Sequence, residues 1–264
     1  MLFRSANLRR TAQTCRSCRS ACLALTRKVR ALRVRARRVI AQLPIVLASR
    51  SPRRQDAMRA LGLPFHVEVS HIELQLPPGD DPCHPGPVAV AKVVDIAGAI
   101  DRPTSTIGAD TIVVDGTDAL GKPVDANHAV EMLVHLRGRE HAVRTGVALA
   151  VSGEIATLEV SSSVRMRLFD RTTAQAYVAT GEPLDCAGSY DVRAGGAALV
   201  ETVIGCLSAV VGFPVVAIAR LLQDHAGITS RVGAIEACEL LCNAPCRARD
   251  PKTAHGCAPT RFGH

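Results

Sequence analysis

Short apolar runs alternate with amphipathic segments from Leu43 to about Leu222. This alternation predicts one α/β domain over residues 43–223, with no solenoid repeat. The expected strands are 44–48, 65–69, 105–114, 141–151, 155–168 and 197–203. The expected helices are 52–61, 87–100, 126–136, 171–180 and 215–223. Ser152-Gly153 predicts a hairpin between two of the strands, and Gly212-Phe213-Pro214 predicts a turn before the last helix.

Residues 1–42 lie outside this pattern and are expected to form a basic, disordered extension. They hold 12 of the 32 Arg and Lys residues of the chain and no Asp or Glu. An Arg-rich start without acidic residues is typical of organelle transit peptides. An over-long predicted start would explain the same composition, and both interpretations stay open.

Residues 224–264 form a cysteine-containing tail without sustained periodicity. Cys238, Cys242 and Cys246 recur every four residues, which is the spacing of one helix face, and Cys257 follows them. A zinc or iron site is one hypothesis for this spacing. Reduced thiols are the favoured interpretation, because the closely spaced cysteine pairs common in zinc sites are absent there.

Composition narrows the classes of function. Apolar residues make up 47% of the chain and charged residues 21%, as in globular proteins. The net charge of +8 comes from the first 42 residues, since the remainder holds 20 basic against 24 acidic residues. With no Trp, two Tyr and five Phe, a nucleic-acid partner is not favoured. Glu201 and Arg220 interrupt the longest apolar stretch, 197–222, so no membrane partner is expected. Ten cysteines without a secretory signal favour a reducing compartment, and we expect a cytoplasmic protein.

The octet Leu47-Ala48-Ser49-Arg50-Ser51-Pro52-Arg53-Arg54 connects the first strand to the first helix. Ser51 suits the N-cap position and Pro52 suits the first helical position. Free backbone N–H groups at such a corner, beside the guanidinium groups of Arg53 and Arg54, attract phosphate. The alternative is an ordinary capped helix with surface arginines.

Asp110 is the one carboxylate in the continuous apolar strand Thr106–Val114. Burial of an unpaired carboxylate is costly, so Asp110 needs a metal ion, a lysine or backbone donors as a partner. Lys122 lies on a turn before a proline, where a solvated loop lysine is the simplest interpretation. Lys92, the one cation of an apolar helix, could simply extend to solvent. Glu73 follows a strand end and suits either a surface acid or a metal ligand.

Seven motifs in order give the chain a family resemblance. They are Leu-Ala-Ser-Arg-Ser-Pro-Arg-Arg at 47–54, Gly-Ala-Asp-Thr at 108–111, Gly-Lys-Pro at 121–123, Leu-Arg-Gly-Arg-Glu-His at 136–141, Thr-Gly-Glu-Pro at 180–183, Ala-Gly-Ser-Tyr at 187–190 and Val-Gly-Phe-Pro at 211–214. From about residue 43 to 222 the chain resembles the Maf family of septum-formation-inhibitor-like nucleoside triphosphate pyrophosphatases. The resemblance implies the fold shared with inosine triphosphate pyrophosphatases, in which a long mixed sheet and flanking helices form two lobes around a cleft.

The resemblance also implies an activity, namely metal-dependent hydrolysis of a nucleoside triphosphate to the monophosphate and pyrophosphate. It implies clearance of surplus or modified nucleotides and an arrest of cell division. By analogy Asp110 accepts the proton of the attacking water, and Asp110 and Glu73 bind Mg²⁺ or Mn²⁺. Triphosphate binding is assigned to Ser49, Arg54, Lys92 and Lys122.

Three positions govern base selection in the family branch that acts on dTTP and UTP. Arg53 and Thr111 match that branch. Arg193 replaces its glutamine, and equally replaces the glutamate of the branch that acts on 7-methyl-GTP. Arginine cannot accept the N3–H of thymine or uracil, whereas it can donate to purine N7 or O6. The base preference therefore stays open.

Two other functions stay open as well. Ile204-Gly205 replaces the Glu-Gly that is usual in the family, which together with Arg193 allows a catalytically weakened nucleotide-binding regulator of cell division. The third hypothesis is a nucleic-acid-associated protein that acts through residues 1–42. A homodimer is retained as a hypothesis about partners.

Overall fold

The computed structural model describes residues 43–70, 82–244, 246 and 260–261. The predictions for residues 1–42, Glu73 and Cys257 concern positions outside the described residues, and they stay predictions. Within the described ranges, no helix has the length and apolar character that crossing a membrane requires.

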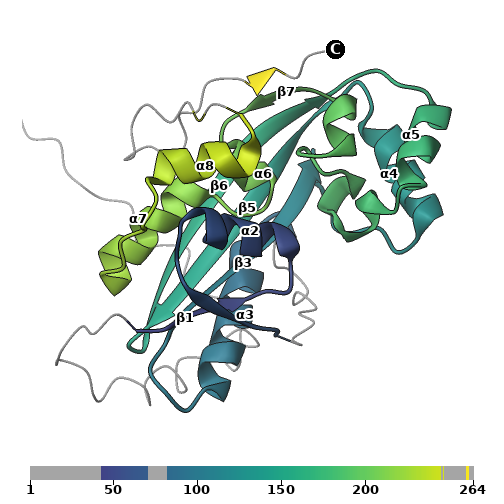
Figure 1. Cartoon of the computed structure of the whole chain (residues 1–264). Helices are drawn as coiled ribbons and strands as arrows, with labels where there is room; N and C mark the ends of the chain where they lie inside the picture. Colours follow the sequence, from purple (N-terminus) through teal and green to yellow (C-terminus); the bar gives the residue numbers. More distant parts are fainter. Residues whose placement is uncertain (1–42, 71–81, 245, 247–259, 262–264) are drawn as a thin grey trace, which may run out of the picture.

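A mixed eight-stranded sheet runs through the molecule (Figure 1). Its strands are β1 (Ile45–Ala48), β2 (Phe65–Glu68), β3 (Ser105–Asp115), β4 (Asp118–Leu120), β5 (Glu140–Val151), β6 (Glu154–Met166), β7 (Val200–Ile204) and β8 (Thr260–Arg261). The order is β2-β1-β3-β5-β6-β7-β8, and β4 pairs with β3. Strand β1 is parallel to β2 and β3, whereas the other pairs are antiparallel. The expected α/β class with a long mixed sheet is confirmed.

The helices follow most of the expected ranges. They are α2 (Pro52–Ala60), α3 (Gly86–Ala99), α4 (Ala126–Leu136), α5 (Arg171–Val178), α6 (Leu207–Val210), α7 (Val215–Ala226) and α8 (Ala234–Cys242), with the 3-10 helices η1 (Glu182–Asp185), η2 (Ala187–Ser189) and η3 (Gly195–Leu199). The strand expected from residue 197 begins only at Val200. Its predicted start is helical because the Glu182 carboxylate accepts the backbone N–H groups of Gly195 and Gly196 and fixes a turn there.

Helices cover both faces of the sheet, since successive strand residues point to opposite sides. Val147 of β5 belongs to the main core with α2 and α7, whereas its neighbour Ala148 packs against Val93 of α3. A Cβ on Gly146 would lie 2.6 Å from the Gly86 nitrogen, so glycine is what lets the start of α3 approach β5. Figure 1 shows α3 on the side of the sheet opposite α2, α7 and α8.

Helices α4 and α5 form a second group with η1 and η2 at one end of the sheet (Figure 1). Each helix begins at an aspartate whose side chain accepts a backbone N–H, Asp125 from His128 and Asp170 from Thr173. Gly181 adopts a left-handed conformation after α5 and turns the chain into η1. This turn brings the segment 182–192 beside β3 and α2, in agreement with the expected two lobes.

Helix α8 was not expected in the tail, because its short pattern of Ala, Cys and Leu carries a weak apolar periodicity. It packs against α2 and α7, and Ala237, Cys238, Leu241 and Cys242 are buried in the main core. Hydrogen bonding to Cys242 and Cys246 and burial raise the pKa of the Cys238 thiol. The favoured interpretation of reduced thiols in this tail stays a prediction.

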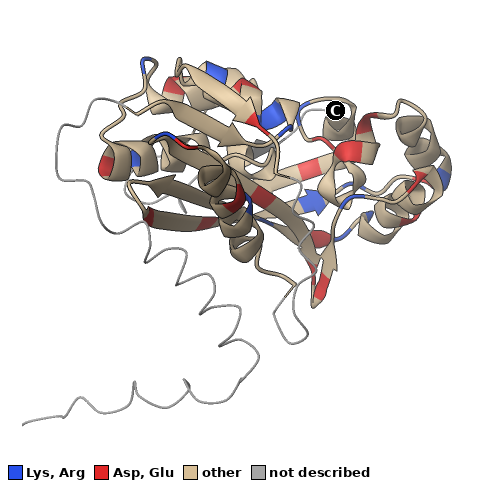
Figure 2. Cartoon of the chain, turned by 90° about the horizontal axis from the view of Figure 1, so that it is seen from below, with Lys and Arg blue, Asp and Glu red and all other residues tan. Residues whose placement is uncertain are grey.

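Basic and acidic residues are interspersed over the described elements (Figure 2). Several form exposed pairs, such as Arg59 with Asp56 on α2 and Arg165 with Glu201 across β6 and β7. Pairs of this kind contribute little to stability because water screens them. The mixed surface agrees with the mildly acidic composition of the chain beyond residue 42.

Candidate active site

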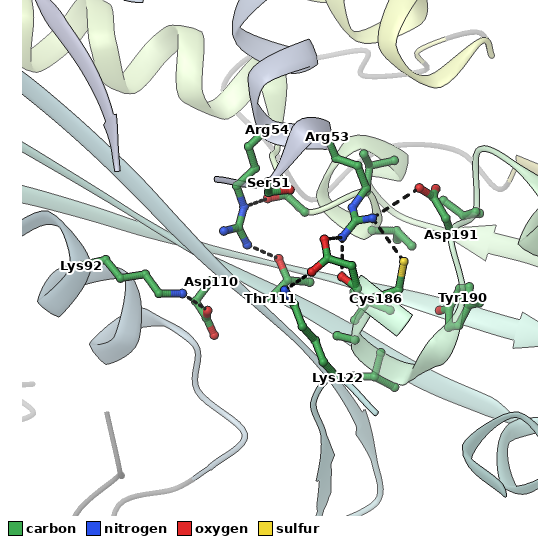
Figure 3. Close-up of a pocket in the computed structure, with 18 residues that line it drawn as sticks. Ser51, Arg53, Arg54, Lys92, Asp110, Thr111, Lys122, Cys186, Tyr190 and Asp191 are labelled. Carbon is green, nitrogen blue, oxygen red and sulfur yellow. Dashed lines mark hydrogen bonds and ion pairs between the residues drawn. The ribbon is translucent and has the colours of Figure 1, made fainter. Parts of the chain in front are cut away.

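A pocket lies where the start of α2, the middle of β3, the segment 182–192 and the end of α6 meet (Figure 3). Its lining residues are Ser51, Arg53, Arg54, Lys92, Asp110, Thr111, Val113, Lys122, Val143, Asp185, Cys186, Ala187, Tyr190, Asp191, Val192, Val210, Val211 and Gly212. We call the part formed by Arg54, Lys92 and Asp110 the Lys92 end, and the part formed by Cys186, Tyr190 and Asp191 the Asp191 end. Figure 3 shows the two ends on opposite sides of Arg53.

The predicted turn of the octet exists, but its cap differs from the expectation. Ser51 occupies the N-cap position of α2, and its side chain makes no capping hydrogen bond. Its backbone N–H instead donates to Ser49 Oγ at 3.2 Å. Ser49 is buried and also accepts from Arg54 Nη1 at 3.3 Å. Ser51 lines the pocket, and Ser49 supports the Arg54 guanidinium behind that lining.

Arg54 is partly buried and is held by three elements. Its Nε donates to the Gly212 carbonyl at 3.1 Å and its Nη2 donates to Thr111 Oγ1 at 3.4 Å. Gly212 has a φ of +103°, and a Cβ there would lie 3.1 Å from Thr111 Oγ1, so the Val-Gly-Phe-Pro turn needs its glycine. Burial lowers the pKa of Arg54, whereas the charge of Asp110 opposes this shift. The pocket thus contains a cation with a fixed position.

Asp110 pairs with Lys92 across the space between β3 and α3. Lys92 Nζ donates to Asp110 Oδ1 at 2.6 Å. Of the partners considered for Asp110, the structure shows the lysine, so Lys92 points to a carboxylate of the pocket instead of extending freely to solvent. A Cβ on Gly108 would lie 2.8 Å from Val93 Cγ2, so the small residue before Asp110 allows α3 to bring Lys92 this close.

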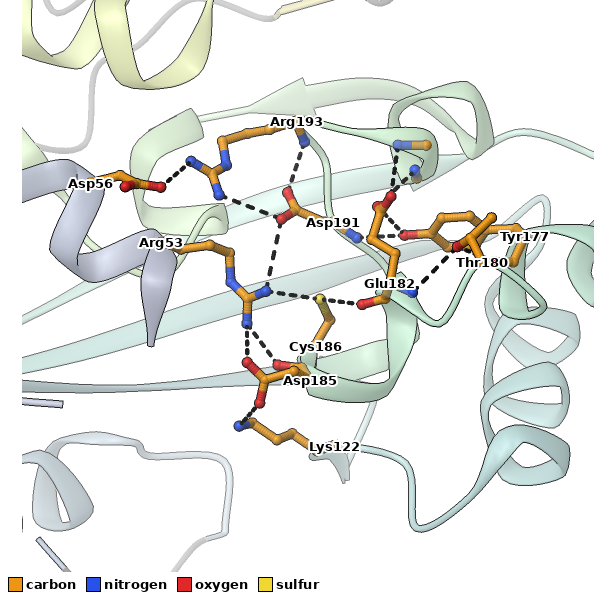
Figure 4. A network of polar contacts seen from close by, with 12 residues as sticks. Arg53, Asp56, Lys122, Tyr177, Thr180, Glu182, Asp185, Cys186, Asp191 and Arg193 are labelled. Atoms are coloured by element: carbon orange, nitrogen blue, oxygen red, sulfur yellow. Dashed lines mark hydrogen bonds and ion pairs between the residues drawn. The ribbon is translucent and has the colours of Figure 1, made fainter. Parts of the chain in front are cut away.

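Lys122 and Arg53 converge on Asp185 at the end of η1 (Figure 4). Arg53 Nη2 donates to the Asp185 carbonyl at 2.6 Å and to its carboxylate at 3.3 Å, and Lys122 donates to the other carboxylate oxygen. Burial alone would raise the pKa of Asp185, but Lys122 and Arg53 lower it overall. Sequence analysis gave Asp185 no role, although the turn-rich segment 180–190 with its two acids was a signal for a pocket loop.

Arg193, which is assigned to base selection, is not one of the pocket-lining residues, and its role stays a prediction. Its Nη2 lies 3.5 Å from Asp191 Oδ2, and its Nη1 lies 3.9 Å from Asp56 Oδ2 (Figure 4). Its backbone N–H donates to Asp191 Oδ1 at 2.9 Å. Asp191 does line the pocket, and its Oδ2 also lies 3.8 Å from Arg53 Nη1. Sequence analysis missed Asp191 because no motif includes it.

The Asp191 end is mostly neutral apart from that carboxylate. Tyr190 shares a 2.7 Å hydrogen bond between its hydroxyl and His141 Nε2. Burial lowers the pKa of His141 to about 4 and raises the pKa of Tyr190, so both are uncharged at neutral pH. Burial also raises the pKa of Cys186 to about 11, against the opposing charge of Arg53. Val113 and Val143 add apolar surface.

The Asp110 carboxylate at the Lys92 end suits a hard divalent cation that the phosphate oxygens of a ligand also coordinate. Asp110 is partly exposed to the pocket, and Mg²⁺ commonly takes one or two protein carboxylates together with phosphate oxygens and water. In the part of the chain that the structure describes, no group of three or more His, Cys, Asp or Glu side chains is arranged to hold a metal. The donor set therefore suits an ion that a phosphate-bearing ligand helps to coordinate.

Comparison with known proteins identifies the family. The family model of Maf-like proteins matches residues 44–225. This range is more than half of the chain and includes all the residues that line the pocket. The chain belongs to the Maf family. Helix α8 lies beyond the matched range, although it packs against the Maf domain.

Similar curated proteins bear the name dTTP/UTP pyrophosphatase. The one from Pelotomaculum thermopropionicum is 38% identical over 182 residues, which are 68% of this chain and 95% of that protein. The one from Pectobacterium atrosepticum is 36% identical over 190 residues, 72% of this chain and 96% of that protein. The one from Escherichia coli O157:H7 is 39% identical over 182 residues, 68% and 92% respectively. Among solved structures, a nucleoside-triphosphatase (dITP/XTP pyrophosphatase) from Mycobacterium abscessus is 16% identical with a TM-score of 0.32, over 47% of this chain and 74% of that one.

Proposed function

We propose that this Maf protein hydrolyses a nucleoside triphosphate between the α- and β-phosphates, and that it releases the monophosphate and pyrophosphate. The observation that carries the proposal is one pocket that holds Asp110 together with Arg53, Arg54, Lys92 and Lys122. Arg54, Lys92 and Lys122 suit the charge of a triphosphate, and Asp110 suits a proton acceptor. The names of the relatives make dTTP and UTP the first substrates to test.

In the proposed mechanism, Asp110 orients a water molecule toward the α-phosphorus and accepts its proton. Lys92, at 2.6 Å, holds the Asp110 carboxylate in position and stabilises its negative charge before the reaction. Mg²⁺ or Mn²⁺ bound by Asp110, with Glu73 proposed as a second ligand, would supply neutralisation of phosphate charge.

Arg54 and Lys122 act on the departing pyrophosphate. Arg54 is fixed by Gly212 and Thr111, so it reorganises little as charge develops on the phosphate oxygens. Lys122 exchanges the Asp185 carboxylate for phosphate oxygens when the substrate binds. Ser49 contributes by orienting Arg54.

The proposed setting is the cytoplasm, where the enzyme clears surplus or modified nucleotides and restrains cell division. A weakened regulator receives no support from the Ile204 position. Ile204 is half exposed at the end of β7 and is not one of the pocket-lining residues. Its departure from the family pattern therefore gives no reason for lost catalysis.

Pyrophosphate release from UTP, dTTP, CTP, GTP and ATP, with Mg²⁺ and with Mn²⁺, tests the proposal. Asp110→Asn keeps the shape of the side chain but removes its basicity, so we expect a loss of about 100-fold or more in kcat. Asp118→Asn, an exposed residue of β4, serves as the matched control and should retain full activity. Circular dichroism confirms that both variants fold. Turnover by Asp110→Asn at the wild-type rate would show the mechanism to be wrong.

A further inference from the structure

Asp191 is the carboxylate at the Asp191 end of the pocket, on the opposite side of Arg53 from Asp110 (Figure 3), and the proposed mechanism gives it no role. It lies between two guanidinium groups, Arg53 at 3.8 Å and Arg193 at 3.5 Å from its Oδ2. Its Oδ1 accepts the Arg193 backbone N–H at 2.9 Å. The side chain is 9% exposed and lines the pocket. These contacts fix an acceptor at a position that a ligand can reach.

The other polar groups of this end cannot supply that acceptor as well. The Tyr190 hydroxyl is engaged with His141, and the Cys186 thiol is protonated at neutral pH, with a pKa raised to about 11 by burial. A thiol is a weak acceptor. Arg53 donates only. A ligand N–H that enters the Asp191 end therefore finds its one charged acceptor in Asp191.

We infer that Asp191 selects the base by accepting the N3–H of uracil or thymine, while Arg53 donates to an adjacent carbonyl oxygen. The inference rests on the proposed function. It assigns Arg193 an indirect role, because Arg193 orients Asp191 from outside the pocket. Arg193 replaces the glutamine of the dTTP and UTP branch, which could accept a hydrogen bond. The site still has an acceptor, because Asp191 supplies it.

The geometry also discriminates between bases. Cytosine has a lone pair at N3, which would face the Asp191 carboxylate and be repelled. Guanine presents two adjacent N–H donors, which favour a carboxylate with both oxygens available, whereas both oxygens of Asp191 already lie against Arg193. A base with one N–H between two carbonyl groups fits this arrangement best.

The experiment measures kcat/KM for UTP, CTP, GTP and 3-methyl-UTP with the wild type and Asp191→Asn. Wild type should use 3-methyl-UTP, which has no N3–H, about tenfold less well than UTP, because Asp191 is left without its partner. Asp191→Asn presents a donor as well as an acceptor, so its UTP to CTP ratio should fall at least about tenfold. A ratio measured in one preparation does not depend on the folded fraction.

Two further variants separate Asp191 from its surroundings. Asp56→Asn changes a residue that contacts Arg193 but does not line the pocket, so it should leave the UTP to CTP ratio unchanged. Arg193→Gln should lower the ratio in the wild type and have no further effect on top of Asp191→Asn, since it acts through Asp191.

The outcomes distinguish this inference from the proposed function. Wild type that releases pyrophosphate from none of the triphosphates overturns both. Wild type that hydrolyses UTP and 3-methyl-UTP equally well, that prefers GTP, or that keeps its UTP to CTP ratio in Asp191→Asn overturns the role of Asp191 alone.

Discussion

The Lys92 end and the Asp191 end of the pocket hold their charges in different ways. At the Lys92 end each charged group has a short, direct contact, as in the 2.6 Å pair of Lys92 and Asp110 or the bond from Arg54 to the Gly212 carbonyl. At the Asp191 end, charges of alternating sign follow one another at longer distances, from Arg53 through Asp191 to Arg193.

The difference has a chemical consequence for each end. Every triphosphate carries the same phosphates, so the Lys92 end needs fixed cations and a fixed base that serve all substrates alike. Bases differ by single donors and acceptors, so discrimination needs an acceptor whose position is set by its neighbours. Changes at the Lys92 end should therefore slow all substrates equally, while changes at the Asp191 end should alter their ratios.

Arg54→Met gives the largest effect among the variants of this comparison. It removes a partly buried cation whose position three elements fix. We expect kcat/KM to fall about 100- to 1000-fold for every triphosphate, with the UTP to CTP ratio preserved. Steady-state pyrophosphate release measures both quantities.

Arg59→Met is the matched control for that loss. Arg59 lies on the same helix, is exposed, and pairs with Asp56 and Gln55 instead of the pocket. It should keep wild-type activity. A base-dependent loss in Arg54→Met would break the division between the two ends.

Sequence reasoning succeeded where local pattern determines position. Apolar runs and short motifs predict β1, β3 and α2. They also predict that Arg54 and Lys122 line the pocket. It failed where a contact joins distant segments. That Lys92 reaches Asp110 depends on how closely α3 approaches β3, and no local pattern encodes this distance.

The same limit applies to the direction of the Arg193 side chain. Its side chain contacts Asp191 two residues away and Asp56 on α2, outside the pocket lining, and the sequence alone could not give this direction. Helix α8 was missed for a related reason. Its buried face is completed by α2 and α7, so tertiary packing and not its own periodicity determines the helix.

Asp185→Asn tests the junction between the two ends and should have a smaller effect. In the structure Asp185 pairs with Lys122, which is proposed to bind substrate phosphate, and with Arg53, which is proposed to contact the base. Its side chain is 52% exposed, and such a pair contributes about 1 kcal/mol at most. Removing this competing anion should lower KM by up to about fivefold for all substrates, while kcat and the base ratio stay constant. A higher KM would mean that Asp185 positions the two cations for catalysis.

His141→Gln tests the support behind Tyr190 at the Asp191 end through the pH dependence of stability. Burial lowers the pKa of His141 to about 4 in the folded protein, below the ordinary value of about 6.5 in an unfolded chain. The unfolded state therefore binds a proton that the folded state does not between these two values. The stability contribution is complete above about pH 6.5 and is lost as the pH falls toward 4, by up to about 1.4 kcal/mol per pH unit.

Urea unfolding at pH 7, 6 and 5 should show this slope in the wild type and a shallower one in His141→Gln. His225→Gln, which changes an exposed histidine on α7, should retain the wild-type slope. Equal pH slopes of the unfolding free energy in all three proteins would mean that His141 is protonated in the folded state without disturbing Tyr190. The groups behind Asp191 would then not be held uncharged by burial.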